Sequence, residues 1–393
     1  MHPYLRKLRN FFVSLQLTVV LLIMSMVLVF AATLDQVNLG IWAVQAKYFR
    51  SFLVMWPVPN SSLSLPLFPG GYLVGGFLLL NLIAAHVYRF KLTWRKTGIQ
   101  LAHAGVILLL LGELVSGLLQ KDSVMQMLEG ETMKYSESFR DHELVLLDKT
   151  NAAYDDVVAI PEAVLADKVS IQHPKLPFLV KIKEYYANAG LQMREPTTPA
   201  SPDQAIAGMG NRIVMTALPL TYKPDEINRP GAYVELTGPD GSLGTWLVSP
   251  QLGAPQKFSV QGHTWEIALR LKRFYKPFSI TLIKITNDVY PGTEIPKNFA
   301  SRVHLRSDDG KEDRETTIFM NNPLRFGGFT FYQYQMNAAN QMSAFEVVRN
   351  PGWLLPYIAC IMMGLGLIIQ FGFSLFGFIN KRAAATAEVA SSQ

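Results

Sequence analysis

Two histidines lie inside hydrophobic segments of this chain, and they are the residues best suited to do chemistry. His86 lies in GGYLVGGFLLLNLIAAHVYRF and His103 lies in GIQLAHAGVILLLLGELVSGLL, on either side of a short basic loop. A polar ring in hydrocarbon is costly, so it usually faces a partner, a cavity or a cofactor. Two imidazoles at similar depth on adjacent antiparallel helices are what an axially ligated haem iron needs. We therefore predict His103 and His86 as ligands of a haem iron.

The helices that must position these histidines are two of four predicted membrane spans. Apolar runs long enough to cross a bilayer, which takes about 20 residues, cover residues 11–32, 71–90, 98–119 and 353–378. The first run has a long apolar core without an obvious small-residue cleavage site, so we expect a retained helix and not a signal peptide. Glu113 lies near the outer end of the third span, where it could act in the site or reach the interface.

Basic residues flank these spans on one side and predict the orientation. They are Arg6, Lys7 and Arg9 before the first span, Arg89, Lys91, Arg95 and Lys96 after the second, and Lys381 and Arg382 after the fourth. By the positive-inside rule, both termini are expected in the cytoplasm. The chain is then a multi-pass protein of a bacterial inner membrane with its large domain in the periplasm.

The large polar segment between the third and fourth spans is expected to be mainly β. Runs such as HELVLLDK, FLVKIKEYY, GAYVELTG, TWEIALRLKRFY and FSITLIKITNDVY alternate with a period of two between turn residues. Such alternation is typical of half-buried antiparallel strands, so we predict a sandwich or an open barrel. A short helix is expected around PEAVLADK, and residues 187–210 are expected to form a long surface loop.

The predicted organisation follows from these boundaries. It comprises a cytoplasmic N-terminus with the first span (1–32), an outer loop (33–70), the second and third spans with their cytoplasmic connection (71–119), the β-rich domain (120–352), the fourth span (353–378) and a disordered cytoplasmic tail (379–393). The aromatic, Pro-punctuated outer loop could lie on the membrane surface or pack against the large domain.

Composition excludes several classes of protein. The 393 residues carry a formal charge of +6, but much of the basic charge flanks the spans, so nucleic-acid binding is not indicated. The single cysteine, Cys360, allows no internal disulfide, and there is no CxxCH or CxxC motif. The histidines of the β-rich domain, His142, His173, His263 and His304, lack metal-ligand spacing, so no catalytic site is predicted there.

Several stretches resemble the ResB family, also called the Ccs1-type subunit, of System II cytochrome c biogenesis. The resemblance rests on LAHAGVILLLLGEL, LLLNLIAAHVYRF, FSITLIKITNDVYPGTEIPKNFASRVHL, TTIFMNNPLRFGGFTFYQYQMN and VVRNPGWLLPYIACIMMGLGLII, in this order along most of the chain. The series is specific, although no single motif is. The chain has no WWD-like run, which fits the ResB half of a two-subunit complex.

The resemblance implies a function that composition does not. It implies a non-catalytic subunit of a haem lyase, or cytochrome c synthetase, that carries haem b in transit and supports its attachment to apocytochrome c CxxCH sites. The implied partners are a ResC or CcsA-type membrane subunit, apocytochrome c, thiol-reducing proteins and membrane lipid. His103 fits the family's HxG motif, whereas His86 departs from the family pattern. His86 could be a second ligand, a replacement ligand or an incidental residue.

Two other functions remain open. A b-type cytochrome subunit of a redox complex would also hold haem between His86 and His103, but permanently. A transmembrane electron path normally needs two haems and four ligands, and only two intramembrane histidines near one face are convincing here. A haem-free membrane scaffold with a periplasmic binding domain would need neither histidine.

Overall fold

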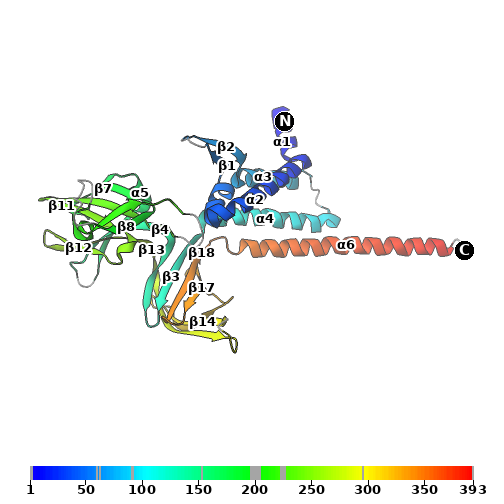
Figure 1. Ribbon diagram of the computed structural model, residues 1–393. Coiled ribbons are helices and arrows are strands. Elements are labelled where there is room, and N and C mark those ends of the chain that lie inside the picture. Colours follow the sequence, from blue (N-terminus) through cyan, green and yellow to red (C-terminus); the bar gives the residue numbers. More distant parts are fainter. Residues whose placement is uncertain are drawn as a thin grey trace. The chain divides into compact units, whose positions relative to one another are not determined.

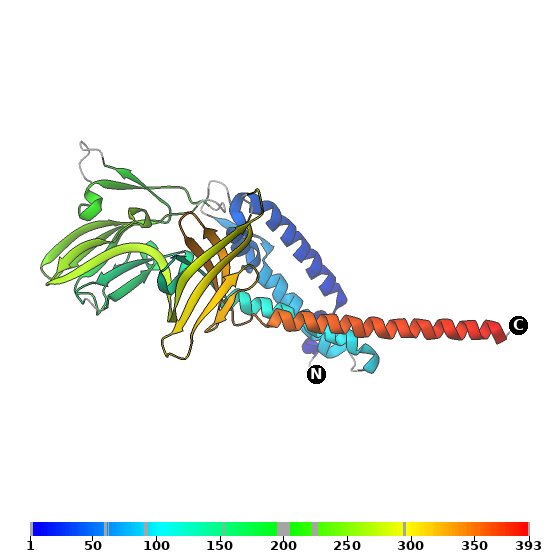
Figure 2. The same cartoon turned by 90° about the horizontal axis from the view of Figure 1, so that it is seen from below.

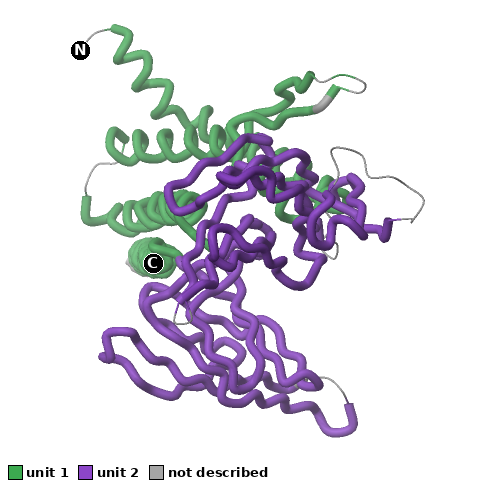
Figure 3. The backbone as a smooth tube through the Cα atoms, turned by 90° about the vertical axis from the view of Figure 1, so that its left-hand side faces the viewer, with its two compact units in different colours: residues 1–121, 222–224, 350–393 green, residues 122–221, 225–349 purple. Residues whose placement is uncertain are grey.

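The computed structural model describes residues 3–58, 61, 63–89, 93–151, 154–194, 205–221, 227–293 and 296–391. The chain forms two compact units, one mainly of Met1–Lys121 and Asn350–Gln393 and the other mainly of Asp122–Thr221 and Asp225–Arg349 (Figure 3). Parts of several predicted features, namely Phe90, Lys91, 195–204, Tyr222 and the last two residues, lie outside the described residues.

The first unit is helical, and in its described part four helical stretches are long and apolar enough to cross a membrane. Its helices are α1 (Pro3–Phe12), α2 (Leu15–Val44), α3 (Gly71–Arg89), α4 (Thr97–Leu119) and α6 (Leu355–Ser391) (Figure 1). These helices are rich in Leu, Val, Ile and Phe, and most of their apolar side chains are exposed. A helix with that composition needs an apolar solvent around it, so the predicted four-span membrane protein is confirmed.

The first span differs from its predicted limits at both ends. The chain breaks at Ser14, whose hydroxyl caps α2 by accepting a hydrogen bond from the Leu17 amide at 3.3 Å. The helix then continues beyond Ala32 to Val44, with a local break at Gly40 (φ 70°), and into a π-helical turn, η1 (Gln45–Phe49). Polar residues from Asp35 onward ended the apolar run in the sequence without ending the helix, because no helix-breaking residue precedes Gly40.

The rest of the predicted outer loop also has regular structure. Strands β1 (Leu53–Pro57) and β2 (Ser64–Pro69) form an antiparallel hairpin. Tyr48 and Val54 are buried against Leu28 and Ala32 of α2, so this segment packs onto its own helix. A short 3-10 turn, η2 (Trp94–Lys96), precedes α4.

The tail after the fourth span, predicted to be disordered, is helical in the described residues of the structure. Helix α6 runs without interruption to Ser391, and Figure 2 shows it as one long rod. The sequence AAATAEVAS contains no Gly or Pro, and alanine has the highest intrinsic helix propensity. Small size and polarity suggested disorder, but helix propensity decides the backbone here.

The second unit is built from strands, as predicted. They are β3 (Lys121–Leu128), β4 (Thr132–Asp148), β5 (Asp156–Pro161), β6 (Ser170–Ile171), β7 (Leu179–Tyr186), β8 (Ala189–Met193), β9 (Ile213–Ala217), β10 (Gly231–Gly238), β11 (Gly241–Val248), β12 (Gln256–Val260), β13 (His263–Val289), β14 (Pro296–Ser307), β15 (Asp313–Phe319), β16 (Leu324–Phe326), β17 (Phe329–Asn337) and β18 (Met342–Arg349). They form a sandwich lobe and a barrel lobe.

The sandwich lobe packs two sheets face to face. One layer is a sheet in the order β11-β10-β7-β6, which contributes Val180, Ile182 and Val234 to the core. The opposing layer consists of the C-terminal half of β4 and the N-terminal half of β13, together with β5 and β12. Alternate residues of each strand enter the shared core, where Phe178 and Trp265 meet edge-on at 5.1 Å. The helix predicted at PEAVLADK is present as α5 (Glu162–Ala166), with Leu165 buried.

The barrel lobe is a strongly curved sheet in the order β15-β14-β13-β4-β3-β18-β17-β16 (Figures 1 and 2). Phe278, Phe331 and Phe345 fill its interior. A polar brace joins its two sides, because Ser301 of β14 donates to the Gln333 side chain of β17 at 2.7 Å and lies 2.8 Å from the Ser343 hydroxyl of β18. The prediction of a sandwich or a barrel is thus met by one lobe of each kind.

A single strand joins the two lobes. The sequence suggested two strands on either side of Pro277, but β13 is continuous from His263 to Val289. Its register with β4 shifts between Tyr275 and Ile280, and the chain bends there. Proline cannot donate to the ladder, so it is tolerated at such an irregularity without ending the strand.

The prediction of a loop over residues 187–210 was wrong for the described residues near each end of this range. Residues 189–193 form β8, which pairs with β9, and Gly208–Asn211 form a 3-10 turn, η3. The mixture of Gly, Ala and Gln in β8 gives no alternation, so its pairing partner, not its own sequence, defines it as a strand.

Candidate functional site

Helix α4 carries His103 and is held by a row of glycines on its other side. Gly98, Gly105 and Gly112 are buried at intervals of seven residues. A Cβ atom added to Gly98 would lie 2.6 Å from the Gly366 carbonyl, and one on Gly105 would lie 2.9 Å from the Ala359 carbonyl. Small residues allow such close backbone approach between membrane helices. The glycine face therefore fixes α4 against α6.

His103 lies on the opposite side of α4 from that glycine face. Each helical residue advances the direction by about 100°, so a residue two positions before Gly105 points the other way. The imidazole is half-buried. Packing against α6 thus leaves His103 on a face that α6 does not cover.

The hydrogen bond of His103 selects one tautomer. Its Nδ1 lies 2.8 Å from the Ile99 carbonyl oxygen, one turn earlier. A carbonyl can only accept, so Nδ1 is the donor, and in the neutral ring of this tautomer Nε2 carries the lone pair. Metal-binding histidines commonly donate their second ring N–H in this way, which orients the ring and raises the basicity of the ligand. A histidine at a helix interface could make the same backbone bond without binding a metal, and the bond is compatible with ligation through Nε2.

Helix α3 also carries its histidine, His86, away from its main packing face. Its buried side is marked by Val74 and Asn81, and the Asn81 side-chain NH₂ donates to the carbonyls of Phe12 (2.7 Å) and Ser14 (3.1 Å). His86 comes five residues after Asn81, about 140° further round the helix, and is half-buried. His86 therefore lies away from the face that α1 and α2 cover.

The structure brings both histidines to the same end of two helices that contact each other. His86 is three residues before the end of α3 and His103 is six residues after the start of α4. At about 1.5 Å per residue they lie about 4.5 Å and about 9 Å from their helix ends. Two imidazoles near the same ends of neighbouring helices are the type of donor that a haem iron takes.

Glu113 does not belong to this pair. It follows His103 by ten residues, about 15 Å along the helix, and its side chain is exposed. Near it, Ser116 accepts a hydrogen bond from the Asn350 side-chain amide at 2.9 Å, which joins the end of α4 to the segment leading into α6. The outer end of α4 is thus held by neutral polar contacts.

The histidines of the second unit each have a local contact. His142 contacts Glu162, His263 contacts Asp148, and His304 contacts Asp313. The ring of His173 accepts from the Lys175 amide at 3.2 Å within a turn. No group of three or more metal-ligating side chains occurs within the described residues.

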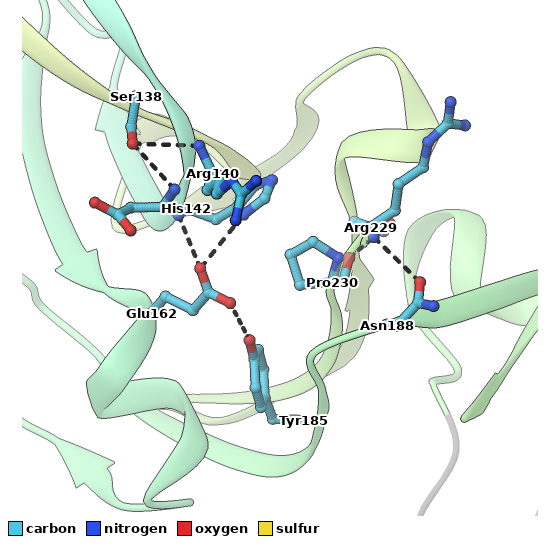
Figure 4. A network of polar contacts seen from close by, with 10 residues as sticks. Ser138, Arg140, His142, Glu162, Tyr185, Asn188, Arg229 and Pro230 are labelled. Atoms are coloured by element: carbon cyan, nitrogen blue, oxygen red, sulfur yellow. Dashed lines mark hydrogen bonds and ion pairs between the residues drawn. The ribbon is translucent and has the colours of Figure 1, made fainter. Parts of the chain in front are cut away.

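The contact between His142 and Glu162 is part of a larger hydrogen-bond network around the Glu162 carboxylate (Figure 4). One carboxylate oxygen accepts from the His142 backbone amide at 2.9 Å, and the other accepts from the Tyr185 hydroxyl. Burial raises the pKa of Glu162, but the hydrogen bonds from His142 and Tyr185 outweigh it and lower that pKa below its usual value. Burial and the bond to Glu162 raise the pKa of Tyr185. The cluster is a satisfied structural network, because its donors and acceptors serve one another.

A buried lysine in the barrel lobe escaped notice in the sequence. Lys276 is only 5% exposed, and its ammonium group donates to the Ser136 hydroxyl at 2.6 Å and to the Phe274 carbonyl at 3.2 Å. Burial lowers the pKa of Lys276 from 10.5 to about 8. The Ser136 hydroxyl also lies 2.8 Å from that of Ser123. Both serines are buried, so this polar chain supports the barrel and offers no access to a substrate.

A polar pocket also went unpredicted, at the basic end of the helical unit. It is a hollow of about 370 Å³, open to the surface, and is lined by Arg9, Asn10, Val13, Ser14, Tyr88 and Arg89. It forms where the break between α1 and α2 meets the last turn of α3. The Ser14 cap is a local signal for the break, but the Asn81 side chain of a distant segment ties the break to α3, so the pocket itself has no local sequence signal.

Comparison with known proteins places a family region in the second unit. Residues 256–342 match the model of the ResB-like family, from the start of β12 through β17. Protein NrfI of Wolinella succinogenes is 33% identical over 92 residues, which are 23% of this chain and 10% of NrfI. The match therefore spans about a tenth of that relative. The resemblance to the ResB family is thus confirmed over residues 256–342, which include FSITLIKITNDVYPGTEIPKNFASRVHL and TTIFMNNPLRFGGFTFYQYQMN, whereas the motifs of the helical unit lie outside this match.

Proposed function

We propose that this ResB-like chain is a membrane subunit of a cytochrome c biogenesis complex that holds haem in transit and supports its covalent attachment to apocytochrome c CxxCH sites. The large β-rich unit would face the periplasm and the helical unit would lie in the inner membrane, as the basic flanks of the spans favour. The partner would be a ResC or CcsA-type subunit. Bond formation would be a property of the complex.

The observation that carries this proposal is the hydrogen bond between His103 Nδ1 and the Ile99 carbonyl. It holds the ring in the tautomer whose Nε2 can ligate iron, on a helix face that the α4–α6 glycine packing leaves uncovered. The ResB-like match points to cytochrome c biogenesis, and the hydrogen bond points to His103 as the residue that would bind the haem iron.

In this proposal the residues of the chain bind and orient haem b, whose iron supplies the ligation chemistry. His103 would be the first axial ligand. His86 would supply the second ligand or leave that position to a histidine of the partner. The apolar surfaces of α3 and α4 would exclude water from the porphyrin edge.

A b-type cytochrome subunit would use the same two histidines but keep its haem permanently. Both histidines lie within about 10 Å of the same helix ends. A path for electrons across the bilayer would need a second haem near the other face. In the described part of α3 and α4, the opposite halves contain no histidine.

The test is an absorption spectrum with a pyridine haemochrome assay on the purified full chain, with and without its CcsA-type partner. We expect haem b that is strongest with the partner and lost in His103→Ala, with a smaller loss in His86→Ala. His173→Ala, a change to an exposed histidine in the other unit, is the matched control and should retain haem.

Two results would contradict the proposal. Absence of haem from every preparation, with cytochrome c maturation intact in a strain carrying both substitutions, would leave a haem-free scaffold. Stoichiometric haem that the partner and apocytochrome never discharge would indicate a resident b-type haem.

A further inference from the structure

The pocket lined by Arg9 and Arg89 has the chemistry of an anion site. Its polar lining consists of two guanidinium groups, the Asn10 amide, the Ser14 hydroxyl and the Tyr88 phenol. All of these can donate hydrogen bonds, and none is a carboxylate. The half-buried Arg9 guanidinium donates to the Asn10 side-chain oxygen at 3.1 Å, Arg89 is exposed, and the lining holds no negative group to balance their charges.

The surrounding sequence supplies no such negative group. Residues 1–34 and 71–112 contain no Asp or Glu, whereas they contain Arg6, Lys7, Arg9, Arg89, Lys91, Arg95 and Lys96. The positive-inside rule explains basic residues on this side of the membrane, but it does not require two of them to line one cavity. The helical segments that form the pocket therefore carry only positive charge, which favours the binding of an anion there.

The walls of the pocket are fixed before any ligand arrives. The Asn81 side chain, 1% exposed, ties the Phe12 and Ser14 carbonyls to α3. Phe12 stacks on Phe77 at 6.0 Å, and the Arg9 guanidinium lies 5.8 Å from the centre of the Tyr88 ring. Such preorganisation lowers the entropy lost on binding.

The location of the pocket, at the ends of two apolar helices, indicates what kind of ligand it would bind. Arg89 ends the apolar helix α3, and Ser14 begins the apolar helix α2. A ligand at this level would place its charged group between the arginines and its apolar body alongside the helices. Arginine pairs well with carboxylate and phosphate groups because its planar donors match two acceptor oxygens.

We propose that this pocket binds the carboxylate or phosphate group of an amphipathic molecule in the cytoplasmic leaflet of the membrane. A haem propionate and the headgroup of an anionic phospholipid share this chemistry. The haem source rests on the proposed function, and His86 lies one turn before Arg89 on the same helix. The phospholipid source does not depend on haem binding.

The test compares Arg9→Gln/Arg89→Gln with Arg6→Gln/Lys96→Gln in the full chain in lipid nanodiscs. The second pair removes the same charge from the same two basic segments, residues 6–9 and 89–96, but lines no part of the pocket. Haem and haem dimethyl ester, which lacks free carboxylates, are titrated by their Soret absorption. Retention of phosphatidylglycerol over phosphatidylcholine is measured by native mass spectrometry.

Whichever ligand occupies the pocket, haem or phosphatidylglycerol, should bind the pocket variant about tenfold or more weakly than it binds the control pair. If haem binding weakens while the ester is unaffected, the anion is a propionate. If phosphatidylglycerol retention falls while haem binding is unchanged, the anion is a lipid headgroup. A pocket variant that matches the control pair in both assays would overturn the proposal. If no preparation binds haem, the proposed function fails while the lipid assay still decides the pocket.

Discussion

Replacement of Lys276 by methionine should stabilise the barrel lobe at neutral pH. The ammonium group of Lys276 is 5% exposed, and burial lowers its pKa from 10.5 to about 8. A shift of this size corresponds to about 3.4 kcal/mol, at about 1.4 kcal/mol per pKa unit. That value is an upper limit for the cost of burying the charge.

The gain should be smaller than this limit. Methionine loses the hydrogen bonds to the Ser136 hydroxyl and the Phe274 carbonyl, which contribute about 1 kcal/mol each. Ser136 retains its contact with Ser123, and a thioether can keep the contact that Lys276 makes with the Phe329 ring. We therefore expect Lys276→Met to raise the free energy of unfolding at pH 7 by about 1–2 kcal/mol.

The same pKa shift predicts a pH dependence of definite sign. Between pH 8 and pH 10.5 the unfolded chain keeps the Lys276 proton, whereas the folded chain has released it. The unfolded state then binds more protons, so this group makes folding more favourable as pH rises. The stability advantage of the methionine variant should therefore be largest at pH 7 and shrink toward pH 10.5.

Hydrogen exchange of barrel-strand peptides, measured by mass spectrometry on the full chain in detergent, tests both statements. Lys284→Met, which replaces an exposed lysine on the same strand, is the matched control and should change stability by less than about 0.5 kcal/mol. Thermal unfolding midpoints from pH 7 to pH 10.5 give the pH arm. Destabilisation of Lys276→Met by more than 1 kcal/mol at pH 7, or a difference that does not change with pH, would refute the reasoning.

Two further predictions concern the helical unit. Gly105→Leu should separate α4 from α6 and cost about 1–3 kcal/mol, because its Cβ would lie 2.9 Å from the Ala359 carbonyl; a lower thermal midpoint of the full chain checks this. Gly117→Leu, on the same helix with no atom within 4 Å of the added Cβ, should be neutral, and equal effects of the two would contradict the packing argument. Alkaline phosphatase fused after Gly241 should be active in a bacterial host, and fused at Ser391 it should be inactive. The reverse pattern would invert the proposed topology.

Much of the second unit could be predicted because its strands repeat with a period of two. The run GAYVELTG coincides with β10, and HELVLLDK ends β4 with its apolar residues buried. The continuity of β13 could not be read in this way, because Pro277 is a strong signal of interruption. Whether a proline ends a strand or only bends it depends on the register of the neighbouring strand, which one segment does not contain.

The candidate site was predictable to the same local extent. His103 and its bond to Ile99 lie one turn apart, and the histidine stood out because it lies in an apolar run. The pocket at Arg9 depends on Asn81, which is 69 residues from Phe12 in the chain. The burial of Lys276 depends on the curvature of a sheet around it. Contacts between distant segments carry both features, and single-segment patterns do not report them.

The pairing of α4 with α6 has a consequence for biosynthesis. The glycine face of α4 is complete once Leu119 has been translated, but α6 begins only at Leu355, roughly 230 residues later. At about 5–20 residues per second, α4 waits roughly 12–50 seconds for its partner. During that interval the ribosome adds the whole β-rich unit while a helix with an exposed glycine face stands in the lipid or at the insertion machinery. The helix pair is thus assembled after the domain inserted between its members, and a slow or stalled β-rich segment would lengthen the time for which α4 is exposed to misassembly.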